Sequence, residues 1–323
     1  MGSVPDRMAV GAWHPVARPA PTPGQSHIAH LSLFGIPLTA RSDDAAVLAV
    51  LAGICDASPA LESDALPINL SLVIDPTLIG SLSSPPRIDG MRVTIDGPSF
   101  VAQADAARGQ GWCRVSPELR DDLDQLRDVA LEPLLLFLIT RRGRAPLHAA
   151  AFLGDGFAVL LAGPSGAGKS CLTLAAHRAG FTPLSDDTVF VETGSRPRVW
   201  GLPRPIHLFA HDAPESDQVI RLRNGKLKRA VTLGRARAPR RADRAALCLL
   251  RFGDAVALEP IDPADAVRAF AVLEPGFDLL ADDIAAAVAA LAQRGVWSLT
   301  LSRRPDEAIA LLADNLPLLR GGC

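Results

Sequence analysis

The stretch Gly156-Phe-Ala-Val-Leu-Leu-Ala-Gly-Pro-Ser-Gly-Ala-Gly-Lys-Ser-Cys171 indicates the fold of the second half of this 323-residue chain. Its first part, Gly156 to Ala162, is a continuous apolar run, as expected of a strand that is buried on both faces. The glycine-rich part that follows, Gly163 to Ser170, matches the pattern Gly-x₄-Gly-Lys-Ser. A helix is expected from Lys169 to Gly180, because glycine commonly ends a helix. A strand, a glycine loop and a helix in this order predict a phosphate-binding loop.

Each residue type in this loop has a chemical reason. The glycines allow successive backbone N–H groups to surround phosphate oxygens without interference from a Cβ atom, and the following helix directs the positive end of its dipole at the same anion. Lys169 supplies a positive charge to the β and γ phosphates, and Ser170 supplies a hydroxyl to Mg²⁺. The sequence therefore predicts ATP and Mg²⁺ as cofactors. The residues expected to contact the nucleotide are Gly163, Ser165, Gly166, Ala167, Gly168, Lys169, Ser170 and Cys171.

The lysine of the loop argues against a chance glycine-rich turn. The chain contains 26 glycines, so such turns are expected, but of its 33 Lys and Arg residues only Lys169, Lys226 and Lys228 are lysine. One of these three occupies the single position at which the loop requires lysine. The motif alone does not name a reaction, because kinases, GTPases, transporters and motors all contain it.

Two segments beside the loop narrow the choice. The first, Pro146-Leu-His148-Ala-Ala-Ala-Phe152, precedes the strand, and the second, Leu184-Ser-Asp186-Asp187-Thr-Val-Phe-Val191, follows the helix. This arrangement resembles the HPr kinase/phosphorylase family and looks closest to the shorter HPr-kinase-like enzymes of lasso-peptide gene clusters. The segment Gly201-Leu-Pro-Arg-Pro-Ile-His-Leu208 is similar to that subgroup as well. The resemblance covers Leu147 to Leu208 most firmly.

The resemblance implies a phosphoenolpyruvate-carboxykinase-like P-loop fold that transfers phosphate to a serine hydroxyl. By position, Asp186 matches the aspartate that acts as base toward this hydroxyl. Asp187 matches the acidic residue near Mg²⁺, which makes Ser170 and Asp187 the implied metal ligands, and His148 matches the histidine near the acidic pair. The Glu-x-Arg-Gly stretch of the bifunctional enzymes has no clear counterpart here, which weighs against phosphorylase activity and against HPr as the substrate.

The chemistry of the acidic pair is sensible without the family. A hydroxyl that attacks a γ-phosphate needs a carboxylate to accept its proton, and the metal needs an oxygen ligand besides Ser170. Adjacent residues of an extended stretch point in opposite directions, so the two aspartates can serve two partners. The alternative is an ordinary solvated acidic pair, as expected at Asp43-Asp44. Asp254, which follows an apolar run, is a rival metal carboxylate, and His148 alone could be a structural histidine.

Composition excludes several classes of function. A net charge of −2 gives no general attraction to nucleic acid or to anionic membranes, and no apolar run reaches the ~18 residues that span a bilayer. Without a signal-peptide pattern, we expect a cytoplasmic protein. The five cysteines have no paired spacing that would indicate a disulfide framework or a zinc site. Ten Lys or Arg residues lie between Arg221 and Arg244, but this segment has no aromatic residue for base stacking.

The pattern along the chain predicts two domains that follow a leader. Residues 1–26 are proline-rich and are expected to be a disordered leader. Residues 27–143 show short alternating apolar stretches, as in Ile68 to Ile74, then a helical stretch from Ser116 to about Arg141, so a smaller α+β domain with a linking helix is expected. Residues 144–323 are expected to form the α/β P-loop kinase domain. Its further strands and helices are expected at Ala245–Phe252, Val296–Leu301, Asp278–Arg294 and Asp306–Leu312.

The sequence thus predicts an ATP-dependent kinase that phosphorylates a serine of a peptide or small protein. The basic segment from Arg221 to Arg244 could attract an acidic peptide or the nucleotide phosphates, or could be a solvated loop. A small-molecule kinase and a regulatory nucleotide-binding ATPase without transfer are the alternatives. Nucleic acid and membrane are not expected as partners, and homo-oligomerisation stays open.

Overall fold

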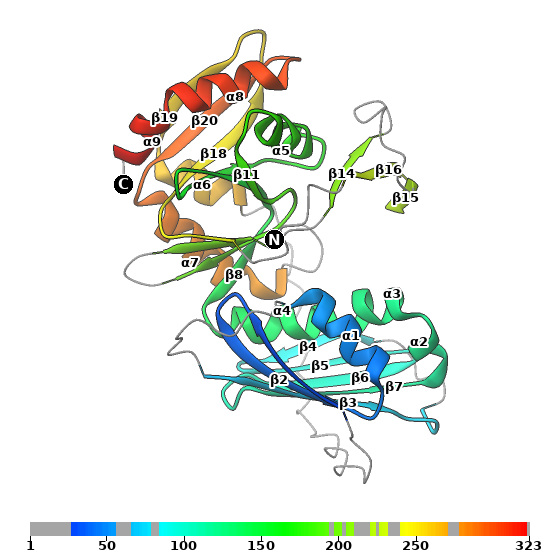
Figure 1. Ribbon diagram of the computed structural model, residues 1–323. Helices are drawn as coiled ribbons and strands as arrows, with labels where there is room; N and C mark the ends of the chain where they lie inside the picture. Colours follow the sequence, from blue (N-terminus) through cyan, green and yellow to red (C-terminus); the bar gives the residue numbers. More distant parts are fainter. Residues whose placement is uncertain are drawn as a thin grey trace, which may run out of the picture. The chain divides into compact units, whose positions relative to one another are not determined.

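The computed structural model describes residues 27–55, 66–78, 84–193, 197–201, 205–209, 220–223, 226–231, 240–270 and 278–321. The predicted leader lies outside these ranges. The chain divides into two compact units (Figure 1). The first comprises the residues up to His30, Leu38–Ile54 and Ile68–Leu134, and the second comprises Leu31–Pro37, Cys55–Pro67 and Leu135–Cys323.

The first unit is built on a seven-stranded sheet. Its strands lie in the order β1-β2-β3-β7-β6-β5-β4. The central pairs β2–β3 and β3–β7 are parallel, and β7, β6, β5 and β4 follow one another as an antiparallel meander. The alternation predicted for Ile68 to Ile74 corresponds to β3. The strand bounds are β1 His27–Leu33, β2 Ile36–Ser42, β3 Ile68–Ile74, β4 Ser84–Asp89, β5 Arg92–Gly97, β6 Phe100–Asp105 and β7 Gln110–Val115.

The single long helix predicted after Ser116 is a series of shorter ones. They are α2 (Pro117–Asp121), α3 (Leu123–Leu126), the π-helical turn η1 (Arg127–Leu131) and α4 (Glu132–Thr140). Asp122 causes the first break, because it ends α2 and its side chain caps α3 by accepting from the Gln125 N–H. A π turn before Pro133 fits this residue, since proline has no N–H and its ring clashes with the carbonyl four residues earlier.

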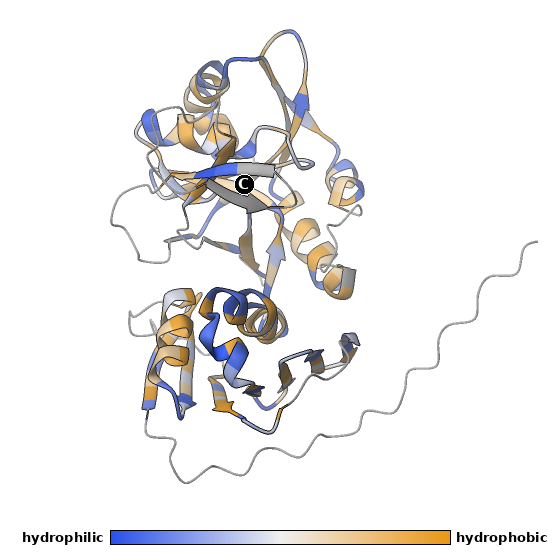
Figure 2. Ribbon diagram, turned by 90° about the vertical axis from the view of Figure 1, so that its right-hand side faces the viewer, coloured by the Kyte–Doolittle hydropathy of each residue, from blue (hydrophilic) through white to orange (hydrophobic). Residues whose placement is uncertain are grey.

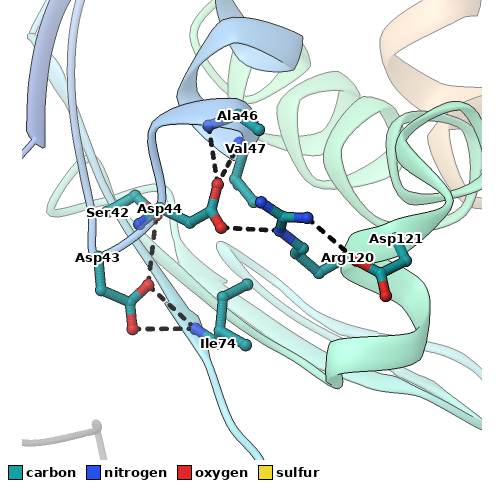
Figure 3. Close-up of polar contacts among 8 residues, drawn as sticks. All are labelled: Ser42, Asp43, Asp44, Ala46, Val47, Ile74, Arg120 and Asp121. Carbon is teal, nitrogen blue, oxygen red and sulfur yellow. Dashed lines mark hydrogen bonds and ion pairs between the residues drawn. The ribbon is translucent and has the colours of Figure 1, made fainter.

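The acidic pair Asp43-Asp44 holds the first unit together (Figure 3). Asp44 caps α1 (Ala45–Ile54) by accepting from the N–H groups of Ala46 at 2.7 Å and Val47 at 3.3 Å. Its second oxygen accepts from Arg120 Nε at 2.8 Å. The Asp43 carboxylate accepts from the backbone N–H of Ile74, at the end of β3. The expectation of a solvated pair was therefore wrong, because both side chains satisfy backbone donors that would otherwise stay unpaired.

The second unit centres on a six-stranded sheet in the order β11-β9-β10-β18-β20-β19. The strands β10, β18 and β20 are mutually parallel, while β9 runs antiparallel to both β10 and β11. All six residues of β10 are buried, which confirms the buried strand predicted before the glycine loop. The predicted strands at Ala245–Phe252 and Val296–Leu301 are β18 and β20. The remaining bounds are β9 Ala149–Gly154, β10 Phe157–Ala162, β11 Thr182–Ser185 and β19 Ala257–Ile261.

Two helices cover one face of this sheet. Alternate residues of β10, β18 and β20 form a single buried cluster with α5 (Lys169–Arg178) and α8 (Pro305–Asp314). These helices confirm the ones predicted after the loop and near the C-terminus. The helix predicted at Asp278–Arg294 is the turn η2 (Asp278–Leu280) followed by α7 (Ala281–Ala292). Figure 2 shows hydrophobic residues concentrated along the strands and helices of both units.

Two small sheets and two unpredicted helices complete the second unit. The small sheets have the orders β17-β13-β12-β8 and β14-β16-β15. Across the described ranges, no helix is long and apolar enough to cross a membrane. The bounds are β8 Arg144–Leu147, β12 Val189–Glu192, β13 Arg198–Gly201, β14 Ile206–Phe209, β15 Ile220–Arg223, β16 Lys226–Val231, β17 Arg240–Ala242, α6 Pro263–Phe270 and α9 Leu316–Gly321.

Candidate active site

The strand order brings the predicted site residues to one end of the six-stranded sheet, the end at which β10 finishes. This end is called the edge of the sheet below. The glycine loop follows β10 directly, and Ala162 at the end of β10 pairs with Ala149 at the start of the antiparallel β9. His148 precedes β9, so it lies at the same edge as the loop. Because β11 runs antiparallel to β9, it ends at this edge too, and Asp186 follows its last residue, Ser185. Segments that are far apart in sequence therefore converge here.

His148 and the acidic pair both lie where the chain passes between two sheets. His148 joins β8 of the four-stranded sheet to β9 of the six-stranded one, and residues 186–188 join β11 to β12 in the same way. The strands on each side are paired, with Leu147 opposite Val189 and Ala151 opposite Ser185. The two crossings therefore lie side by side, which the sequence could not reveal.

The glycine loop has the backbone that a phosphate site requires. Gly166 and Gly168 both have a φ of 89°, in the left-handed region that residues with a Cβ rarely adopt. Gly168 caps α5 without any side-chain hydrogen bond to the first turn, so the N–H groups at the start of this helix are not taken up by a capping side chain. Ser165 and Gly166 are exposed, and Ala167 is buried beneath the loop.

Lys169 lies inside the loop. Its side chain is buried, and its ammonium group donates to the carbonyls of Gly163 at 2.6 Å and Pro164 at 3.2 Å. A buried ammonium beside the exposed residues Ser165 and Gly166 is a suitable receptor for a polyphosphate, because the phosphate oxygens can replace the two carbonyls as its partners.

Ser170 and Asp186 are in direct contact. The Ser170 hydroxyl donates to Asp186 Oδ2 at 3.3 Å, and the backbone N–H of His207 in β14 donates to the same oxygen at 3.1 Å. Asp186 is buried, and this burial raises its pKa to about 6. The neighbouring charge of Asp187 acts in the same direction, whereas the hydrogen bonds from His207 and Ser170 act against it. A buried carboxylate without full charge compensation favours a cation beside it.

Asp187 lies beside His148. Its Oδ1 lies 3.6 Å from His148 Nδ1, and its side chain is 40% exposed, against 20% for His148. The hydroxyl of Ser185 accepts from the N–H groups of Asp187 and Thr188, which fixes the turn between β11 and β12. The adjacent aspartates therefore have different partners, as expected for an extended stretch, and only Asp187 is widely accessible to solvent.

The residues fit a Mg²⁺ ion. Oxygen ligands lie 2.0–2.1 Å from Mg²⁺, so two neighbouring ligands of its octahedron are about 2.9 Å apart. The 3.3 Å between Ser170 Oγ and Asp186 Oδ2 is close to this value. The described part of the chain contains no group of three or more His, Cys, Asp or Glu side chains arranged for a metal. Beside a phosphate loop, phosphate and water usually supply most of the ligands of Mg²⁺.

Two other predicted residues have less central positions. Asp254 follows β18, on the far side of β10 from β11 and Asp186, and it is exposed. Cys171 is partly buried and packs with Leu174 of α5 and with the apolar face of β14.

Comparisons with known proteins find distant similarity to solved structures. No protein-family model and no curated protein matches the chain. A solved structure of the Hpr(Ser) kinase/phosphatase from Coxiella burnetii is similar with a TM-score of 0.27 and 15% sequence identity, over 54% of this chain and 96% of that chain.

Sequence reasoning missed two groups that shape the site. The first is the Ser185 hydroxyl, and a weak signal for it exists, since serine side chains often accept hydrogen bonds from the backbone N–H groups that follow them in a turn. The second is the His207 N–H bonded to Asp186. His207 lies in the strand β14, and no local pattern indicates that its N–H meets Asp186.

Proposed function

We propose that the protein is an ATP-dependent kinase that transfers the γ-phosphate to a serine hydroxyl of a peptide or small protein, with lasso-peptide precursors as candidate acceptors. One observation carries the proposal. The Ser170 hydroxyl at the start of α5 contacts the buried Asp186, and the accessible Asp187 lies next to it beside His148. A phosphate loop, a metal carboxylate and a separate accessible base are what phosphoryl transfer to a hydroxyl requires.

The nucleotide phosphates bind the loop and Lys169 in this proposal. The backbone N–H groups of the loop bind the β-phosphate, and the Ala167 N–H exchanges its bond to the Pro164 carbonyl for a phosphate oxygen. The Lys169 ammonium likewise exchanges the carbonyls of Gly163 and Pro164 for phosphate oxygens. Ser170 and Asp186 would hold Mg²⁺, which would neutralise part of the charge of the phosphates.

The acceptor proton goes to the second aspartate. The acceptor oxygen attacks the γ-phosphorus, the bond from this phosphorus to the β–γ bridging oxygen breaks, and ADP leaves. Asp187 accepts the hydroxyl proton, and His148 Nδ1 orients its carboxylate. These roles exchange the two that the family resemblance implies for Asp186 and Asp187. The exchange is supported by the contact of Asp186 with Ser170 and by the greater exposure of Asp187.

The acceptor class is tested by incubating the full chain with Mg·ATP and two panels of acceptors. One panel contains serine peptides, including lasso-peptide precursors, and the other contains free serine and small hydroxyl metabolites. Mass spectrometry should find phosphate on a peptide serine. Phosphate on small molecules alone would support a metabolite kinase, and ATP hydrolysis without any acceptor would support a regulatory ATPase.

Lys169 variants check that any transfer depends on the loop. Lys169→Ala should abolish ATP turnover, because the positive charge that Lys169 supplies to the β and γ phosphates is lost. Lys169→Arg should be poor as well, because a planar, bulkier guanidinium does not fit between the loop carbonyls. Near-normal turnover by the arginine variant would contradict the binding mode proposed for the phosphates.

A further inference from the structure

Phe252 is the most exposed large hydrophobic residue of the described part of the chain, with 72% of its surface accessible. It is the last residue of β18, whose first six residues are all buried. Most exposed apolar side chains need no explanation, so exposure alone carries little weight. Its position relative to the phosphate loop gives this side chain its meaning.

Phe252 continues the sheet face on which α5 begins. Alternate residues of a strand share a face, and Ala246, Cys248 and Leu250 of β18 belong to the cluster beneath α5. Leu250 lies under the loop, since a Cβ atom added to Gly163 would be 3.2 Å from its Cβ. Phe252 is the next residue of this series.

The neighbouring strand confirms how close Phe252 lies to the loop. In the parallel register, Phe252 is opposite Leu301 of β20. The Cδ1 atom of Leu301 would be 3.8 Å from a Cβ atom added to Gly168, the residue that caps α5. Leu301 is thus about one strand spacing, ~4.8 Å, from Phe252, and its side chain reaches the start of α5.

The order of the strands indicates the direction in which a bound nucleotide extends from the loop. Along the edge of the sheet, the acidic pair follows β11 on one side of β10, and Phe252 ends β18 on the other side. A nucleotide whose γ-phosphate lies beside Asp186 and Ser170 extends its ribose and base away from them. This direction leads from the loop, over the carboxyl end of β18, to Phe252. Ligands of such sheets characteristically bind outside the carboxyl ends of the strands.

We propose that Phe252 is the stacking surface for the base of the bound nucleoside triphosphate. The inference rests on the proposed function, because it requires the phosphates in the loop. Aromatic side chains stack on any base, since every base has a π face, so this contact binds the ring without reading its edge. It therefore predicts that the purine contributes to affinity and that adenine and guanine nucleotides bind with similar strength.

The experiment compares nucleotide with inorganic polyphosphate on the full chain. Calorimetry measures the dissociation constants of Mg·ATP, Mg·GTP and Mg·tripolyphosphate for the wild type and for Phe252→Ala, Phe252→Trp and Leu318→Ala. Leu318→Ala is the matched control, because Leu318 is also an exposed apolar residue, at 53%. It lies on α9 close to Arg320, whose carbonyl accepts a hydrogen bond from Arg244. Arg244 directly precedes β18, so Leu318 is near the end of this strand that lies opposite Phe252.

The expected pattern separates base from phosphate. Phe252→Ala should raise the dissociation constants of both nucleotides about ten-fold and leave that of tripolyphosphate unchanged. Phe252→Trp should bind nucleotides as tightly as the wild type does. Leu318→Ala should change none of the three dissociation constants. Unchanged nucleotide binding by Phe252→Ala, or equal loss of tripolyphosphate, would overturn the stacking role and leave the phosphate site standing. Wild-type protein that binds neither ligand would overturn both proposals.

Discussion

Each unit of this protein contains an Asp-Asp pair, and the two pairs have opposite surroundings. Asp43-Asp44 in the first unit accepts hydrogen bonds from three backbone N–H groups and from the guanidinium of Arg120 (Figure 3). Asp186 in the second unit is held by one backbone N–H and one hydroxyl, neither of which carries a charge. The oxygens of the first pair accept hydrogen bonds that stabilise the fold, whereas oxygens of the second pair face the glycine loop and a histidine.

The pKa values of the two pairs express this difference. Partial burial acts to raise the pKa of Asp44, but the bonds from Arg120, Ala46 and Val47 outweigh it and hold that pKa below the ordinary value. Burial raises the pKa of Asp186 to about 6, with the charge of Asp187 adding to it. A carboxylate that the protein leaves under-compensated is ready for a metal ion, and this is a better indication of function than the dipeptide itself.

The largest effect should separate the pairs by activity. Asp187→Asn should lower phosphoryl transfer about 10³-fold, since an amide cannot accept the proton of the acceptor hydroxyl. Asp43→Asn should leave transfer unchanged, because an amide oxygen can still accept from the Ile74 N–H. Initial rates of peptide phosphorylation at saturating Mg·ATP measure both. Equal activity of the two variants would remove the functional distinction between the pairs.

A second effect should separate the two members of the functional pair. Asp186→Asn should raise the Mg²⁺ concentration needed for ATP binding by about ten-fold or more, because a metal ligand loses its charge. Asp187→Asn should need about as much Mg²⁺ as the wild type. Magnesium titrations of ATP binding measure this, with Asp254→Asn as the variant of the rival carboxylate. The reverse pattern would restore the roles implied by the family resemblance, and an effect of Asp254 alone would identify the rival.

A third effect concerns the structural pair. Asp44→Ala should lower the free energy of unfolding by about 1 kcal/mol, because α1 loses its capping oxygen. Asp44→Asn should lose less, since asparagine also caps helices well. Denaturant unfolding gives the stabilities, and ATP affinity measured in parallel should not change. A loss of ATP affinity in Asp44→Ala would mean that this pair is not purely structural.

A fourth effect is the pH dependence of stability in the presence of a chelator. An unfolded aspartate has a pKa of about 3.9, and that of Asp186 is about 6 in the folded protein. Between these values the folded protein keeps a proton that the unfolded chain has released, so stability falls as the pH rises. Asp186→Asn lacks this loss and should melt above the wild type at about pH 7.5, with the difference vanishing near pH 4.

Asp44 should show the opposite sign. Its pKa lies below the ordinary value, so the stability that its charge contributes is present above the unfolded pKa and is lost as the pH falls through the folded one. Calorimetric melting temperatures of wild type and Asp44→Asn should therefore converge in acid. If both pairs gave the same sign, the contrast between their environments would be wrong.

The elements that could be predicted are those with a local cause. β10, β18 and β20 were recognised because a strand buried on both faces needs an unbroken apolar run. The strand β19 was missed, since Ala257–Ile261 is half exposed at a sheet edge and contains a proline. The helix after Ser116 was predicted as one piece, because nothing local announces that Asp122 both ends one helix and starts another.

The sequence by itself predicted the phosphate loop, because closely spaced glycines, a lysine and a serine between a strand and a helix form a local pattern. It also indicated the acidic pair and His148 as candidates. Only the tertiary structure decided that Asp186 meets Ser170, that Asp187 meets His148 and that Phe252 stands exposed beside the loop. These contacts depend on strand order and on two crossings between sheets, which arise from pairing between residues far apart in the chain. The same holds for Asp44, whose partner Arg120 lies 76 residues away.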